Sequence, residues 1–265
     1  MKTYFIDSFT TEKFKGNPAA VCLVENEVSE ATMQHVAAEI GFSETAFIQK
    51  REDTVYGIRF FTPKQEIALC GHATLASAKV IFETGNKLQL SFVNKDGVRL
   101  PVEKSGDKIR MQFPVYTTNP FEVPSAMLQA LGIDSIIDSR YNKEMNIVLI
   151  EMNDANRLQQ LKPDIPALIK SFQGISGVLV TAKSNSMAYD FEYRYFWPWI
   201  GTDEDPVTGA VQTFLTPYWA QKLNKKELKA FQASQRTGVM ETQFSGNMVY
   251  IFGEAVKTLE GNIIL

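Results

Sequence analysis

The sequence predicts an α/β (α+β) fold made of two similar halves, each a mixed β-sheet wrapped around one apolar helix. The first observation is that a strand, a loop and an apolar helix occur together within residues 60–82. The second is that the same plan returns within residues 195–215. The third is that a hairpin follows each plan, with turns at Ser105-Gly106-Asp107 and Ser245-Gly246-Asn247. Because the matching segments occur in the same order in both halves, they indicate an internal repeat.

The length and the charge of the chain indicate two domains and a small-molecule partner. With 265 residues, the chain is long enough for domains at 1–117 and 118–265, with a last strand that can return to the first domain. The net charge of −3 arises from 27 Lys+Arg against 30 Asp+Glu, without a basic block. This balance argues against nucleic acid and against an anionic membrane surface. No apolar run approaches the ~20 residues of a membrane-spanning helix.

The cysteines and the first residues indicate a reduced environment. Cys22 and Cys70 are too few for a disulfide framework, and the N-terminus lacks the pattern of a signal peptide. We therefore expect a cytoplasmic protein, and we include a homodimer among the expected states.

The first half begins with two predicted strands and a helix. Residues 1–8 alternate between apolar and polar, and Gly16-Asn17-Pro18 turns the chain into a strand over 19–24. Ser29 is expected to begin a helix that Gly41 ends. A strand over 42–48 follows, with Glu44 at its head. This glutamate is either a surface residue or a desolvated base whose pKa is raised toward neutrality.

The central helix of each half begins at a turn suited to a ligand. In Cys70-Gly71-His72-Ala73-Thr74, the glycine lets a ligand approach the backbone, and first-turn N–H groups lack intrahelical acceptors. Aligning Pro63 with Pro198 places Asp205 at the position of Cys70, with Pro206 in the first turn of the second helix. Two such turns at one cleft would suit a small carboxylate.

The second half is predicted to contain helices and strands in the following order. We expect a helix over 125–131 closed by Gly132, a strand over 146–152 and a helix over 163–172. A strand over 175–181 matches 42–48, with Gly177 in place of Glu44. The alternation from Tyr189 to Tyr195 predicts a half-exposed strand.

Four motifs together resemble those of a known family. They are Gly16-Asn17-Pro18-Ala19-Ala20-Val21, Gly41-Phe42-Ser43-Glu44-Thr45-Ala46-Phe47, Cys70-Gly71-His72-Ala73-Thr74 and Glu204-Asp205-Pro206-Val207-Thr208-Gly209. In this order they resemble the phenazine-biosynthesis isomerase (PhzF-like) family, which is related in fold to diaminopimelate epimerase. The resemblance covers essentially the whole chain.

The resemblance implies a pseudo-symmetric pair of domains, each a β-sheet barrel around a central helix, with an active site between them and no cofactor or metal. It makes Glu44 the proton-shuttling acid/base and His72 and Asp205 its catalytic partners. The positions that it implies for substrate binding are Gly71, Ala73, Thr208, Gly209 and Ala210. The implied reaction is a biosynthetic proton shift on a small carboxylate such as a cyclic, unsaturated amino acid.

The sequence departs from the family pattern at one place. After Asp-Pro-Val-Thr-Gly the family commonly has Ser-Ala-His, whereas this chain has Ala210-Val211-Gln212. The backbone N–H groups are still present after this change, but Ala210 lacks the serine hydroxyl that could bind a substrate carboxylate. The departure concerns the identity of the substrate rather than the fold.

Other interpretations of the same residues remain open. His72 could be a core histidine, Cys70 a small buried residue, and Asp205 a helix cap. A Cys70–His72 nucleophile lacks an evident third group, and residues two apart seldom face each other. The two histidines and two cysteines show no metal-ligand spacing, and no phosphate-binding glycine motif occurs. The remaining alternatives are a two-base racemase that uses Cys70 and a non-catalytic binding protein.

Overall fold

The computed structural model describes all 265 residues, which form two compact units. The first unit consists of Met1–Phe113 with Tyr250–Leu265, and the second of Pro114–Val249. None of the helices combines the length and the apolarity that a helical crossing of a bilayer needs.

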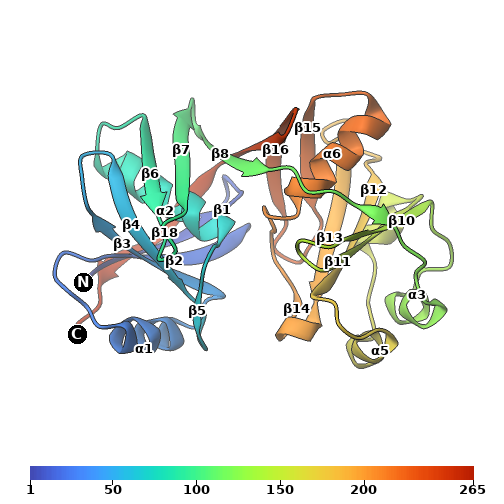
Figure 1. The fold of residues 1–265 in the computed structure, drawn as a ribbon, viewed down its shortest axis with the longest axis horizontal. Coiled ribbons are helices and arrows are strands. Elements are labelled where there is room, and N and C mark those ends of the chain that lie inside the picture. The colour runs from blue at the N-terminus through green and yellow to red at the C-terminus, as the bar shows by residue number, and fades with distance from the viewer. The chain divides into compact units, whose positions relative to one another are not determined.

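Most strands of the first unit precede its long second helix in the chain, and the remaining strands, which include a β-hairpin, follow it (Figure 1). Its elements are β1 (Lys2–Ser8), β2 (Asn17–Leu23), α1 (Glu30–Ile40), β3 (Glu44–Lys50), β4 (Val55–Phe61), β5 (Glu66–Ile67), α2 (Gly71–Thr84), β6 (Gln89–Val93), β7 (Arg99–Ser105), β8 (Lys108–Pro114) and β18 (Ala255–Asn262).

The second unit follows a similar order, with additional short helices. Its elements are β9 (Asn119–Pro120), α3 (Ser125–Leu131), β10 (Asp138–Asn142), β11 (Ile147–Met152), α4 (Ala155–Gln159), α5 (Ile165–Ser171), β12 (Gly177–Lys183), β13 (Phe191–Trp197), the 3₁₀ helix η1 (Pro198–Ile200), β14 (Thr202–Glu204), α6 (Gln212–Leu223), β15 (Glu227–Gln232) and β16 (Gly238–Ser245). Strand β17 (Met248–Gly253) leads the chain back into the first unit.

The strand pairings repeat from one unit to the other. In the first unit, β1–β2 is antiparallel, β2–β3 parallel, β3–β4 and β4–β5 antiparallel, β4–β6 parallel and β6–β7 antiparallel. The seven strands from β10 to β16 pair with the same directions in the same order. Glu44 and Gly177 are the first residues of β3 and β12, as the sequence alignment of the halves predicts. The predicted fold class, with mixed sheets and helices, is confirmed.

The predicted ends of two helices are confirmed by their caps. The Ser29 side chain accepts a hydrogen bond from the Thr32 N–H at the start of α1. Gly41 ends α1 with φ 72°, and Gly132 ends α3 with the same φ. Glycine adopts this left-handed conformation without the steric cost that a Cβ atom would bring. These boundaries are therefore determined locally.

Helix α2 forms the centre of the first unit. It packs against β1, β2, β3, β7 and β18, and Figure 1 shows strands on more than one side of it. Its buried residues include Ala73, Ala76 and Ala78, whose small side chains let the strands approach closely. The N-cap residue Cys70 makes no side-chain capping bond. The first turn of α2 therefore keeps backbone donors available to a ligand.

Helix α6 begins later than the sequence predicts. The prediction placed its first turn at Pro206, but the helix starts at Gln212. The Asp205 N–H donates to the Tyr195 carbonyl, and the Gln232 amide bonds the Asp205 carbonyl and the Thr208 N–H. These bonds hold the segment in a non-helical conformation, so the sequence expectation is wrong by six residues.

Strand β13 is buried, whereas its alternating sequence predicted a half-exposed strand. Six of its seven residues are buried because the charged side chains find partners inside the unit. Glu192 accepts hydrogen bonds from Ser184 and Gln159, and Arg194 forms two bonds of 2.7 Å to Glu204. The alternating sequence therefore predicted the strand correctly, but it did not predict the burial of the strand. Polar side chains can be buried when they have hydrogen-bonding or charged partners.

Candidate active site

Glu44 lies at the beginning of β3, in the interior of the first unit. Strand β3 pairs in parallel with β2, where Ala19 is the partner of Glu44, and antiparallel with β4. The residue is only 6% exposed. The surface interpretation of Glu44 is therefore wrong, and a carboxylate in such a position needs a charged or hydrogen-bonding neighbour.

His72, in the first turn of α2, is that neighbour. Its Nε2 atom lies 3.0 Å from Oε2 of Glu44, and the residue is 8% exposed. The Ser8 hydroxyl donates a 2.8 Å hydrogen bond to the His72 carbonyl and anchors this turn to β1. Oε2 is buried, and its contact with His72 is a close ion pair without hydrogen-bond geometry.

The two groups shift each other's pKa in opposite directions. Burial favours the neutral form of Glu44, but the charge and the hydrogen bonding of His72 outweigh it and lower the pKa of this carboxyl below 4.5. Burial likewise opposes the charged form of His72, but Cys70 and Glu44 outweigh it and raise its pKa well above 6.5. The expectation that the pKa of Glu44 is raised is wrong: desolvation is the largest single effect, but the charge of His72 and the hydrogen bonds from His72 and Ser43 together exceed it. At neutral pH the pair is carboxylate and imidazolium, a base beside an acid.

This pair makes the free energy of unfolding depend on pH. The lowered pKa of Glu44 contributes stability above pH 4.5 that is lost as the pH falls through the folded-state value. The raised pKa of His72 contributes stability below pH 6.5 that is lost as the pH rises through its folded-state value. We expect the stability difference between the native chain and Glu44→Gln, measured by urea unfolding, to be largest between these two values. A difference that does not vary with pH would contradict the ion pair.

Cys70 completes a chain of three side chains, and its position corrects a second expectation. Its Sγ atom lies 3.5 Å from Nδ1 of His72, although residues two apart were not expected to face each other. The sequence showed no third group that could orient a Cys70–His72 pair, and in the structure Glu44 takes this position beside His72. Burial raises the pKa of the Cys70 thiol, which disfavours an activated thiolate nucleophile.

A second cluster forms around Asp205 in the second unit. The Thr208 hydroxyl donates a short hydrogen bond to Asp205, which is 8% exposed. Gln232 holds the backbone of both residues, and the Tyr193 hydroxyl donates to the Thr208 carbonyl at 3.1 Å. Because Asp205 belongs to the second unit and His72 to the first, their expected joint action on one substrate stays a prediction.

The remaining predicted binding residues divide between the two clusters. Gly71 is the first residue of α2, and Ala73, two residues later in the same turn, is fully buried. Gly209 and Ala210 lie in the turn that leads into α6. Gln212, which replaces the usual histidine, is fully buried and accepts a hydrogen bond from Thr216. Its side chain therefore supports α6 from within.

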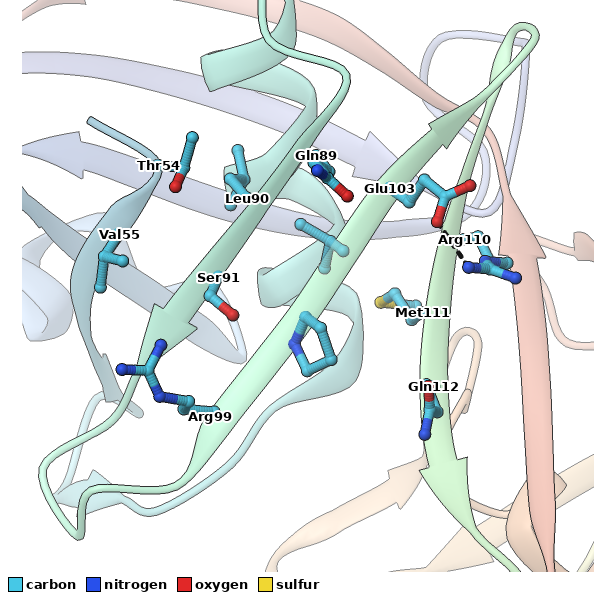
Figure 2. Close-up of a pocket in the computed structure, with 12 residues that line it drawn as sticks. Thr54, Val55, Gln89, Leu90, Ser91, Arg99, Glu103, Arg110, Met111 and Gln112 are labelled. Atoms are coloured by element: carbon cyan, nitrogen blue, oxygen red, sulfur yellow. Dashed lines mark hydrogen bonds and ion pairs between the residues drawn. The ribbon is translucent and has the colours of Figure 1, made fainter. Parts of the chain in front are cut away.

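A surface pocket of about 270 Å³ lies elsewhere in the first unit. Figure 2 shows it across β6, β7 and β8, where Glu103 and Arg110 pair between neighbouring strands. Neither Glu44 nor His72 lines it. Its charged side chains are either paired, as Glu103 and Arg110 are, or exposed, as Arg99 is, so it offers no buried acid–base pair like that at the start of α2.

Known proteins are similar to this chain over nearly its whole length. The family model described as "Phenazine biosynthesis-like protein" matches residues 6–261. An uncharacterized isomerase of Halalkalibacterium halodurans is 40% identical, with 99% of this chain and 98% of that protein covered. The crystal structure of a PhzF family phenazine biosynthesis protein of Enterococcus faecalis has a TM-score of 0.93 and 36% identity, covering 100% and 99% of the two chains.

A more distant solved structure shows how far the fold extends. It is a predicted epimerase of Pseudomonas aeruginosa, with a TM-score of 0.74 and 18% identity over 100% of this chain and 99% of that one. At this identity the likeness concerns the fold alone, and it confirms the expected epimerase-like architecture. The motifs, the acid–base pair and the match over residues 6–261 lead to one conclusion: the chain belongs to the phenazine biosynthesis-like (PhzF) family and is an isomerase.

Proposed function

We propose that this isomerase moves a proton on a small carboxylate-bearing substrate without a cofactor, with Glu44 as the general acid/base. The observation that carries the proposal is the buried pair of Glu44 and His72, 3.0 Å apart with opposite pKa shifts. A buried carboxylate at the start of a strand can take a proton from a carbon beside a carbonyl or an imine. The adjacent imidazolium stabilises the negative charge that develops on the substrate.

The start of α2 supports the expected carboxylate on the substrate. No side chain caps this 14-residue helix, so its first N–H groups and its dipole favour an anion. In the proposed reaction, Gly71 gives the anion close access to the backbone. Asp205, Thr208, Gly209 and Ala210 are proposed to contact the same substrate. A cyclic, unsaturated amino acid, a cytoplasmic location and a homodimer remain predictions from the sequence.

The racemase alternative has one observation in its favour, the contact between Cys70 and His72. It needs two opposed thiols, one from each half. Both cysteines of the chain belong to the first unit, and Cys22 contacts the Thr3 hydroxyl in the neighbouring strand. The proton shift through Glu44 is therefore the better-supported mechanism.

A screen of small cyclic and unsaturated amino acids tests the proposed function. A true substrate should raise the free energy of unfolding by about 2.7 kcal/mol at 100 times Kd, and the melting temperature should rise with its concentration. In deuterated water, proton NMR should show that one carbon-bound proton of this substrate exchanges with solvent. Stabilisation across the screen without any exchange would instead identify a binding protein on this fold.

A further inference from the structure

Glu44, Cys70 and His72 offer three different metal-ligand atoms in one small volume. The carboxylate oxygen, the thiol sulfur and a ring nitrogen all lie within 4.8 Å of one another, and all three side chains are buried. The residues come from the start of β3 and the start of α2. The sequence did not indicate this group because no two of the ligands follow a familiar metal-binding spacing.

The distances fit a cation bound through Nε2 of His72. The Glu44 Oε2 atom lies 3.0 Å from Nε2, and the Cys70 Sγ atom lies 3.9 Å from it. Zinc binds sulfur at about 2.3 Å, and nitrogen or oxygen at about 2.0–2.2 Å, so two such bonds span up to ~4.4 Å. Both pairs that include Nε2 fall within this span, and the oxygen and the sulfur lie within 4.8 Å of each other. Small side-chain rotations would place all three ligands around one ion, with a fourth position left for water.

The burial of the three side chains also favours a bound cation. Oε2 of Glu44 is buried, and its contact with His72 is an ion pair without hydrogen-bond geometry, so a cation could provide a better-directed partner. The thiol and the imidazolium would each release a proton on binding, so affinity should rise with pH.

We propose that Glu44, Cys70 and His72 bind a borderline-soft divalent cation of the Zn²⁺ class, and that the bound ion blocks the isomerase. A sulfur, a nitrogen and an oxygen donor together favour Zn²⁺ over Mg²⁺ or Ca²⁺, which prefer oxygen ligands. The block follows because the ion occupies the carboxylate oxygen that would accept the substrate proton. This second part rests on the proposed function, whereas the binding site does not.

The binding part is tested with metal alone on the chelator-treated full chain. Equilibrium dialysis should show one Zn²⁺ per chain and no competition from Mg²⁺. Co²⁺ should give a thiolate-to-cobalt charge-transfer absorption band in the near ultraviolet. Cys70→Ser, which keeps the side-chain size, should remove the band and weaken Zn²⁺ binding at least tenfold.

Matched controls separate this site from general thiol or imidazole binding. Cys22→Ser removes the other buried cysteine of the same unit and should keep both the band and the affinity. His35→Ala removes the other, exposed histidine and should do the same. Zn²⁺ binding that is absent, or that Cys70→Ser leaves unchanged in a chain with native circular dichroism, would overturn the site.

The exchange of a substrate carbon-bound proton with solvent tests the block separately from the metal site. Loss of exchange at one Zn²⁺ per chain, restored by a chelator, would support the block. Exchange that continues in the chain with bound metal and a charge-transfer band would contradict the role of Glu44 as base, while the metal site would stand.

Discussion

Replacement of Glu44 by glutamine is expected to slow the exchange of a substrate proton with solvent by about 10²–10⁴-fold, the usual contribution of general acid–base catalysis. Glutamine has nearly the same shape but cannot accept the proton from carbon at neutral pH. The substitution also removes the anion that raises the pKa of His72. Proton NMR in deuterated water measures the exchange, and titration of the His72 ring should show a lower pKa.

The matched control is Glu151→Gln. Glu151 is 4% exposed in β11 of the second unit and pairs with Lys222, so it is also a buried carboxylate with a cationic partner. This variant should be destabilised but should keep the exchange rate within a small factor. If Glu44→Gln exchanged as fast as the native chain while Glu151→Gln did not, the assignment of the base to Glu44 would be wrong.

Replacement of Arg194 by methionine is expected to destabilise the second unit by about 3–5 kcal/mol, the cost of removing one partner of a buried ion pair. Its guanidinium donates two bonds of 2.7 Å to Glu204 and one of 2.7 Å to the Leu161 carbonyl. Arg194 is 9% exposed. Without it, the Glu204 carboxylate and this carbonyl lose strong donors in the interior.

All three tryptophans of the chain, Trp197, Trp199 and Trp219, lie in the second unit, so fluorescence during urea unfolding reports on it. Arg157→Met is the control, since its 2.7 Å bridge to Asp134 is exposed and should be worth at most about 1 kcal/mol. Equal losses from the two substitutions would refute the special role of the buried pair. Because Glu204 directly precedes Asp205, Arg194→Met should also disturb the Asp205 cluster.

Features that depend on one residue and its near neighbours could be predicted from the sequence. Ser29 begins α1, and Gly41 and Gly132 end their helices, where expected, because a cap bond or a left-handed φ depends on the local chain. The correspondence of Glu44 with Gly177 followed from the repeat, and both begin their strands. Glu44 and His72 could also be selected, because each lies in a recognisable motif.

Features that depend on neighbours far along the chain could not be predicted. The sequence by itself determined most of the helices and strands, the internal repeat and the family, since all three depend on patterns of residue type along the chain. Only the tertiary structure decided that Gln232 delays α6, that Cys70 joins His72, and that the pKa of Glu44 is lowered. The physical reason is that burial and Coulomb interaction depend on distances in space, and 28 residues separate Glu44 from the imidazole 3.0 Å away.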